Sequence, residues 1–483
     1  MPLTSLPTRG VPKPDLLAAM QTARQSDIRW QEGKAFSLVF LGGEDVTEVA
    51  KEAYNLYFSE NGLNPGAFPS LRRFETEVIG MAAGLLGGDE NTAGNMTSGG
   101  TESILMAVKT ARDWARAHRP HLHRPEIVLP LSAHPAFDKA AEYFDLKIIH
   151  TPTRPDSRAD VAAMRQAIGP ETILLVGSAP SYPHGVVDPI AEIAALAQAH
   201  GCLCHVDACV GGFLLPFARK LGYPIPAFDF SVPGVSSLSA DLHKYGYAAK
   251  GASLILYREA GLRRHQLTAY TDWPGGIYAS PTMMGTRPGG AIAAAWAVMN
   301  YLGEEGYLRL AKTTLETAAK LRAGIDAIPG LHVLSDPDMS VMAIASDSLN
   351  VYEVADEMTL AGWHLDRQQF PPSLHLTVHY GHAAVADGFL ADLAAAARQA
   401  GRFSLRRSSW SLLQRLLAFL LRLLPDRWLS RLTARAGRLL GGGGGLPGRS
   451  APMYGMMGQL PNRGDLRELV LDLVEGFTRP VGN

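Results

Sequence analysis

One stretch of the sequence determines the predicted fold: Ser237-Leu-Ser-Ala-Asp-Leu-His-Lys-Tyr-Gly246. It begins with a short, mostly apolar run and then carries adjacent histidine and lysine residues, His243 and Lys244. The apolar part, 236–240, is predicted to be a strand. A lysine directly after a strand is ordinarily a solvated loop residue. Here it follows two other polar motifs in the chain, and the three have to be interpreted together.

The first upstream motif is Asn95-Met-Thr-Ser-Gly-Gly-Thr-Glu102, which is predicted to open a helix. Gly99 and Gly100 let a ligand approach the backbone, and Ser98 offers a hydroxyl. A helix N-terminus adds N–H groups and the positive end of its dipole. The motif could cradle a phosphate, although an ordinary turn and cap explains such a motif more often.

The second upstream motif is His205-Val-Asp-Ala-Cys209, at the carboxyl end of a predicted buried strand. Ligands of parallel sheets bind at these strand ends. Asp207 could therefore face a ligand, and a helix N-cap is an equally good interpretation of this residue alone.

The order cradle, acid, lysine matches what pyridoxal phosphate requires. Its phosphate needs dipoles and hydroxyls, its ring nitrogen needs a carboxylate, and its aldehyde needs a lysine for a Schiff base. His134, in His134-Pro-Ala-Phe-Asp-Lys139, follows another predicted strand and could stack on the ring. A surface or capping role is the alternative for that histidine.

The rest of the chain predicts an α/β fold, because short apolar strands alternate with helices from about residue 91 onward. The expected strands are 127–131, 147–150, 172–177, 202–206, 236–240 and 253–257, and the expected helices are 101–118, 136–144, 160–168 and 189–200. Residues 1–90 are predicted to be helices and loops. A long helix at 291–325 and strands at 331–334, 341–345 and 374–378 suit a smaller α+β domain.

Composition narrows the functional class. Of the 483 residues, 47% are hydrophobic, a composition typical of globular proteins. The net charge of −1 gives no overall positive field that would attract nucleic acid. No secretory signal is predicted in residues 1–17. The only cysteines, Cys202, Cys204 and Cys209, are interpreted as core thiols of an intracellular protein and not as metal ligands. A cytoplasmic enzyme without a metal is expected.

The segment 404–449 differs from the rest, since it contains many arginines, no lysine and one acid, Asp426. It predicts a basic amphipathic helical insertion with a flexible hinge at 441–445. Its leucines could pack on the enzyme or a partner copy. Alternatively, 404–440 could make peripheral contact with the inner membrane surface.

The chain resembles the sphingosine-1-phosphate lyase family, within the group II pyridoxal-phosphate-dependent decarboxylase superfamily. The resemblance covers about 30–400 and a short piece near 450–460. The similar stretches are Thr97-Ser-Gly-Gly-Thr-Glu-Ser-Ile-Leu105, 134–140, Leu174-Leu-Val-Gly-Ser-Ala-Pro180, 205–213, 228–250, Gly275-Gly-Ile-Tyr-Ala-Ser-Pro281, Gly285-Thr-Arg-Pro288 and Phe370-Pro-Pro-Ser-Leu-His375.

The resemblance implies an aspartate-aminotransferase-type (fold type I) enzyme, with a mostly parallel seven-stranded sheet and a smaller α+β C-terminal domain. The implied division is 1–90 as an N-terminal helical segment, 91–300 as the cofactor domain, 301–403 with 450–483 as the small domain, and 404–449 as the insertion. The resemblance also implies a homodimer with active sites at the subunit interface.

Residue roles follow from the same resemblance. Lys244 would form the Schiff base, with His243 beside the cofactor, Asp207 on the ring nitrogen and His134 on the ring face. Lys250 would act in catalysis or bind the substrate phosphate; a surface turn is the alternative. The residues expected to bind the cofactor phosphate are Ser98, Gly99, Gly100 and, from a loop of the partner subunit at 276–280, Ser280.

Two positions depart from the family pattern. Phe36-Ser-Leu-Val-Phe40 has Phe40 where the family has a tyrosine, and Asn61-Gly-Leu-Asn-Pro65 has Asn64 where it has a histidine. The family residues help to hold the substrate's phosphate. Trp273 and Tyr278 could line a substrate channel or serve only in packing.

The expected reaction is retro-aldol cleavage of a sphingosine-1-phosphate-like 2-amino-3-hydroxy substrate to an aldehyde and an amine. Amino-acid decarboxylation is the second interpretation and transamination the third. These enzymes select a bond by orienting it against the cofactor ring, so the motifs alone do not separate the three reactions.

Overall fold

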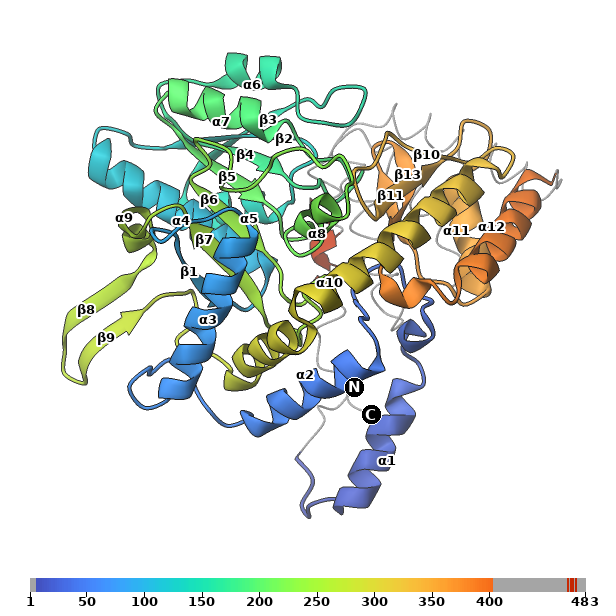
Figure 1. Cartoon of the computed structure of the whole chain (residues 1–483), viewed down its shortest axis with the longest axis horizontal. Coiled ribbons are helices and arrows are strands. Elements are labelled where there is room, and N and C mark those ends of the chain that lie inside the picture. Colours follow the sequence, from blue (N-terminus) through green and yellow to red (C-terminus); the bar gives the residue numbers. More distant parts are fainter. Residues whose placement is uncertain (1–5, 403–466, 469, 473, 476–483) are drawn as a thin grey trace.

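The computed structural model describes residues 6–402, 467–468, 470–472 and 474–475. The predicted insertion 404–449 therefore lies outside the described residues, as do residues 450–466. Figure 1 shows a larger body built on one sheet and a smaller body built on another, with a long helix, α10 (Gly289–Asp326), running between them. Within the described part, no helix is both long and apolar enough to cross a membrane.

The large sheet has seven strands in the order β1-β7-β6-β5-β4-β2-β3. Only β7 runs against the others, since β6 and β1 both pair with it antiparallel. The predicted mostly parallel seven-stranded sheet is thus confirmed. Its strands are β1 (Ala93–Thr97), β2 (Glu126–Pro130), β3 (Lys147–Thr151), β4 (Thr172–Ser178), β5 (Leu203–Asp207), β6 (Ser237–Ala240) and β7 (Ser253–Tyr257).

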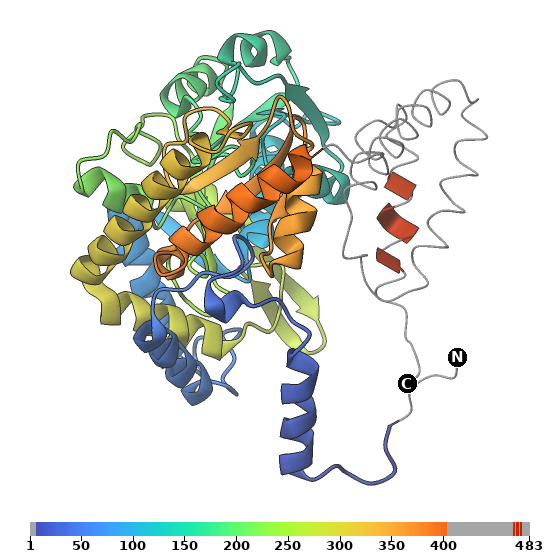
Figure 2. The same cartoon turned by 90° about the vertical axis from the view of Figure 1, so that its right-hand side faces the viewer.

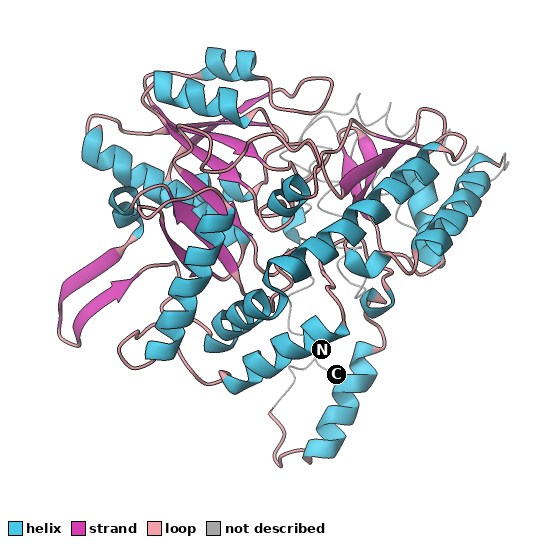
Figure 3. Cartoon of the chain, viewed as in Figure 1, coloured by secondary structure: helices cyan, strands magenta, loops and turns pink. Residues whose placement is uncertain are grey.

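Helices cover both faces of this sheet, because successive strand side chains point to opposite faces and both sets are apolar. On β2, Ile127 and Leu129 join the core under one group of helices, whereas Val128 joins the core on the other face. Figure 3 shows the two helical layers around the magenta sheet. The crossover helices are α4 (Gly100–His118), α5 (Ala136–Phe144), α6 (Val161–Ala167), α7 (Ile190–Ala199) and α8 (Leu215–Lys220).

The small domain is an antiparallel sheet in the order β10-β11-β13-β12. Helices α11 (Val351–Leu360) and α12 (Ala386–Gly401) pack on it, and its core also takes Phe36 from the N-terminal segment. Helix α10 runs across residue 300 and is kinked at Gly303, where φ is 53° and the backbone is not helical. The strands are β10 (His332–Val333), β11 (Val341–Ala345), β12 (Asp366–Gln369) and β13 (Pro372–Thr377).

Two parts of the chain project from the body. The hairpin of β8 (Thr268–Trp273) and β9 (Gly276–Ser280) is exposed at every position except Ser280. Helix α1 (Lys13–Arg24) has no buried residue and stands away from the body in both views (Figure 1, Figure 2). Helices α2 (Glu44–Leu56), α3 (Pro69–Leu85) and α9 (Ala260–Arg263) complete the helices of the described N-terminal and central regions.

The hairpin and strand β1 were not predicted from the sequence. Strand β1 is Ala-Gly-Asn-Met-Thr, whose glycine and asparagine are uncommon in strands. Its position is fixed by pairing along its whole length with β7, a contact between residues about 160 positions apart that no local pattern records.

The turn after β4 joins the two domains at Gly185. This glycine has φ 73°, and a Cβ there would lie 1.9 Å from the carbonyl oxygen of Val341 on β11. Its own carbonyl accepts a hydrogen bond from the N–H of Asp338. A side chain at 185 would therefore push the turn away from the small domain.

Gly185→Ala should lower the stability by about 3 kcal/mol or more, because strain at positive φ adds to a backbone clash. Gly222→Ala is the matched control, since Gly222 has φ 89° and open space around it, and should cost only about 1 kcal/mol. Thermal unfolding of both variants measures the difference. Equal losses would show that the contact with Val341 is easily relieved.

Candidate active site

A cavity of about 450 Å³ lies where the carboxyl ends of β1, β4, β5 and β6 meet. Parallel strands deliver their end residues to one edge of a sheet, so motifs far apart in sequence converge there. The polar residues that line it are Ser98, Thr101, Glu102, His134, Ser178, Tyr182, Asp207, Cys209, Asp241, His243 and Lys244.

Lys244 forms an ion pair with Asp241 across the start of the loop after β6. The Nζ–Oδ2 distance is 2.9 Å and the Asp241 side chain is almost fully buried. Burial alone would lower the pKa of Lys244, but the Asp241 carboxylate outweighs it and raises that pKa above its usual range. The pKa of Asp241 is in turn lowered: its burial is outweighed by the nearby lysine and histidine and by hydrogen bonds.

Asp241 is held in place by a buried chain of hydroxyl groups. Ser253 on β7 donates to its Oδ1 at 2.5 Å, Ser253 contacts Ser103 at 2.8 Å, and Ser103 contacts Thr97 at 2.6 Å. These residues belong to β7, α4 and β1. The position of the lysine's counter-ion is therefore fixed by the strands and the helix that form the cavity.

His243 and Lys250 both have lowered pKa values. Burial, followed by the positive charges of Lys250 and Lys244, lowers the pKa of His243 to about 4, against the opposing effect of Asp241. Burial and the charge of Lys244 lower the pKa of Lys250 to about 8. Lys250 donates to the Leu38 carbonyl at 2.7 Å and lies 5.6 Å from the centre of the Phe40 ring.

Asp207 and His134 face the cavity from the ends of β5 and the loop after β2. Asp207 accepts hydrogen bonds from the Cys209 N–H at 3.1 Å and the Ser239 hydroxyl at 3.3 Å, which fix its carboxylate. The Nδ1 of His134 accepts from the Ala136 N–H, so any proton on a neutral ring is on Nε2. All three cysteines are free and buried, and Cys209 also lines the cavity.

The cradle at the start of α4 contains a carboxylate, Glu102, beside the predicted Ser98, Gly99 and Gly100. The N–H of Ser98 donates to the Glu102 carboxylate at 2.6 Å, so the serine contributes its hydroxyl and not its N–H. The other Glu102 oxygen accepts from the Met283 N–H at 2.9 Å. At Gly100, a Cβ would lie 2.8–2.9 Å from Cys209 and Asp241, so only glycine leaves the cradle open.

These residues fit pyridoxal phosphate. Among the described residues, the buried Nδ1 of His243 has no hydrogen-bond partner, which is expected of an atom that contacts a bound group. Ser98, Gly99 and Gly100 would hold the phosphate, Asp207 the ring nitrogen, His134 a ring face, and Lys244 the aldehyde carbon. These individual roles remain predictions.

Several predicted residues lie outside this cavity in their own chain. Ser280 is buried at the base of the hairpin, and its hydroxyl lies 3.0 Å from both the Thr282 and Met284 carbonyls. Asn64 is exposed and caps its own turn by accepting from the N–H groups of Gly66 and Ala67. Trp273 and Tyr278 are exposed on the hairpin and do not line the cavity.

Sequence reasoning missed two carboxylates of the site, Asp241 and Glu102. Both stand in motifs quoted for other residues, three positions before Lys244 and four positions after Ser98. An acid three residues before a lysine that follows a strand was the available signal. Tyr182 was also missed; it stacks on His375 at 4.0 Å and donates to Asp366, which ties the cavity wall to the small domain.

Comparisons with known proteins agree with this geometry. The pyridoxal-dependent decarboxylase conserved domain matches residues 14–345. A sphingosine-1-phosphate lyase of Oryza sativa is 41% identical over 480 residues, covering 98% of this chain and 81% of the relative. The relative from Dictyostelium discoideum is 46% identical over 80% of this chain and 73% of its own length.

Solved structures give the same result. The sphingosine-1-phosphate lyase of Burkholderia pseudomallei K96243 has a TM-score of 0.80 and 39% identity, covering 86% of this chain and 97% of the other. Glutamate decarboxylase of Lactobacillus brevis shares the fold, with a TM-score of 0.73 at 18% identity.

The fold, the cavity and these comparisons together define a fold type I, pyridoxal-phosphate-dependent enzyme of lyase type. Within that class the chain belongs to the sphingosine-1-phosphate lyase family, which confirms the resemblance drawn from its motifs.

Lys244→Ala should abolish turnover and the yellow colour of the cofactor-loaded protein, because no other amine lines the cavity among the described residues. Borohydride followed by peptide mass spectrometry should find the cofactor fixed to Lys244. Lys250→Ala is the control and should keep this attachment. Fixation on Lys250 in the unaltered protein would overturn the assignment.

Proposed function

We propose that this enzyme cleaves the Cα–Cβ bond of a phosphorylated long-chain 2-amino-3-hydroxy base, releasing a long-chain aldehyde and a phosphorylated amine. The relatives named sphingosine-1-phosphate lyase, one of them matched along 98% of this chain, carry the proposal. The cavity supports it, since it combines a lysine, a strand-end acid and a second lysine nearby.

Each charged residue of the cavity and its surroundings has a separate role in this reaction. The bound cofactor supplies an electron sink next to the substrate's α-carbon. Asp207 keeps the proton on the ring nitrogen, and Asp241 keeps a place for the Lys244 ammonium when that lysine is not bonded to the cofactor. Lys250, with a pKa of about 8, is partly neutral near physiological pH and can take the proton of a β-hydroxyl.

Lys250 is also a cation that contacts Phe40, the residue at the position of the family tyrosine. Its Nζ lies 5.6 Å from the centre of the Phe40 ring. Phe40 packs edge-on against Tyr245 at 4.9 Å, so the ring is held by the core. In this chain the headgroup contact at position 40 therefore depends on Lys250 and not on a phenol.

Decarboxylation is the second candidate. A probable L-aspartate decarboxylase of Pyrococcus furiosus is 34% identical over 358 residues, which cover 93% of that protein. The same cavity could break the bond from Cα to a carboxylate, since the orientation of the substrate selects the bond. The family match along the whole chain favours the lyase.

The enzyme is further proposed to work as a homodimer whose sites are shared between subunits. The hairpin β8–β9 exposes Tyr270, Trp273 and Ile277, and exposed apolar patches of this kind mark interaction surfaces. Ser280 stands at its base and outside its own cavity. The cytoplasmic location and the membrane contact of 404–440 remain predictions, and the latter concerns residues outside the described ones.

Product analysis tests the reaction. The purified holoenzyme should release a long-chain aldehyde from a phosphorylated long-chain base, detected by mass spectrometry after trapping with a hydrazine. Incubation with L-aspartate or L-glutamate should release no CO₂. The opposite pair of results would establish the decarboxylase in place of the lyase.

The headgroup is tested by comparing kcat/KM for the phosphorylated and the unphosphorylated base. We expect a strong preference for the phosphorylated base, and Lys250→Met should reduce it. The double variant Phe40→Tyr with Asn64→His should change the ratio by less than about thirtyfold, since it adds at most two hydrogen bonds worth about 1 kcal/mol each. A wild type without preference that gains one in the double variant would mean that the natural substrate lacks the phosphate.

A further inference from the structure

Two loops that are far apart in sequence are fastened together beside strand β1. Arg287 follows the hairpin, and its Nη2 donates to the Gly62 carbonyl at 2.8 Å. The N–H of Gly62 donates back to the Arg287 carbonyl at 2.9 Å, and the Asn61 side chain accepts from the Arg287 N–H. Loop 61–65 and the segment after β9 therefore form one unit.

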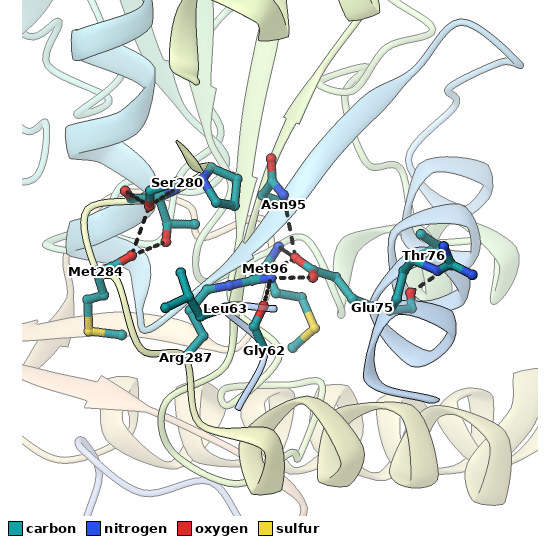
Figure 4. Close-up of polar contacts among 12 residues, drawn as sticks. Gly62, Leu63, Glu75, Thr76, Asn95, Met96, Ser280, Met284 and Arg287 are labelled. Carbon is teal, nitrogen blue, oxygen red and sulfur yellow. Dashed lines mark hydrogen bonds and ion pairs between the residues drawn. The ribbon is translucent and has the colours of Figure 1, made fainter. Parts of the chain in front are cut away.

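Glu75 on α3 anchors this unit to the large sheet (Figure 4). Its two oxygens accept from Arg287 at 2.6 and 2.8 Å, and one of them also accepts from the Met96 N–H on β1 at 3.1 Å. Both charged side chains are about nine-tenths buried. Figure 4 shows Arg287 between Glu75 and Gly62, with Ser280 and Met284 on the neighbouring turn.

The Glu75–Arg287 pair lies beside its own chain's cofactor cavity but does not line it, although Arg287 borders a small pocket that also includes Ser98 and Glu102. Asn64 and Ser280 lie outside the cofactor cavity as well. Yet loop 61–65 and the hairpin base are the two segments whose family counterparts act on a phosphate. In a shared-site homodimer such segments can act in the partner's cavity.

We propose that the Glu75–Arg287 pair is a positioning device that acts in trans: it sets loop 61–65 and the hairpin base as a single unit that completes the cofactor site of the second copy. The proposal rests on the proposed homodimer. A guanidinium suits this task because its planar fork reaches the carboxylate and the Gly62 carbonyl together, which a lysine ammonium could not do with the same geometry.

A mixed dimer tests the direction of this effect. Chains with Arg287→Met and chains with Lys244→Ala, each carrying a different tag, are co-expressed and the mixed dimer is isolated by two affinity steps. In that dimer, one site combines an intact Lys244 with loops from a partner chain whose Glu75–Arg287 pair is intact. The other site lacks both features.

The Arg287→Met homodimer should bind pyridoxal phosphate at least about tenfold more weakly, since small displacements of positioning groups are costly. The mixed dimer should regain wild-type affinity at one site, with borohydride fixing the cofactor on Lys244 of the Arg287→Met chain. Lyase turnover should return to half that of the wild type, because one site of two is complete. A mixed dimer no better than the Arg287→Met homodimer would overturn the proposal.

Arg367→Met provides the matched control. The Arg367–Asp356 pair of the small domain has side-chain exposures of 12% and 5%, close to the 10% and 11% of Arg287 and Glu75. Whatever affinity Arg367→Met loses should not return in its mixed dimer with Lys244→Ala. If Arg287→Met fails to fold, Glu75→Gln, which keeps the side-chain shape, takes its place in the same experiment.

The outcomes also separate this proposal from the proposed function. Cofactor affinity and borohydride fixation need no substrate, so they decide the trans effect even if the wild type releases no aldehyde. If two differently tagged wild-type chains do not copurify, both the shared-site homodimer and the trans effect of the Glu75–Arg287 pair are refuted. The result of the lyase assay does not depend on this outcome.

Discussion

A half-buried ammonium beside a fully buried carboxylate is the constraint around which this active site is arranged. Lys244 has to reach the cavity with most of its side chain removed from water, and a charge in such a place requires a partner. Asp241 provides it at 2.9 Å. Because Asp241 is itself bound to Ser253 on β7, the one antiparallel neighbour of β6 in the large sheet, the lysine is held by strand pairing and not by a flexible loop.

The same cavity has to admit a phosphate next to two carboxylates, Asp241 and Glu102. Both are occupied by donors from the chain: Glu102 accepts from two backbone N–H groups, and Asp241 accepts from a hydroxyl and the lysine. Hydrogen bonds of this kind reduce the field that a carboxylate presents to a neighbouring anion. The start of α4, with its two glycines, then contributes the positive end of a helix dipole.

The sequence predicted what local pattern can encode. The fold class follows from the alternating strands and helices, and the cofactor follows from the order of cradle, acid and lysine. The structure places the predicted residues Ser98, His134, Asp207 and Lys244 in one cavity. Strand β1 was not predicted because its glycine and asparagine are poor strand formers and its position is set by pairing with β7. The Glu75–Arg287 ion pair was not predicted because 212 positions separate the two residues in the sequence.

The reaction and the substrate therefore depend on different parts of the molecule. The residues predicted to bind the cofactor lie at strand ends, where the sheet fixes them and where the chain order of motifs is diagnostic. The residues at the two departures from the family, Phe40 and Asn64, lie in loops. Phe40 is fixed by packing on Tyr245 and by Lys250, whereas Asn64 is committed to its own turn. The residues at these two positions can accordingly change without disturbing Asp207 or Lys244, which explains how the cofactor motifs remain complete in a chain that departs from the family pattern at Phe40 and Asn64.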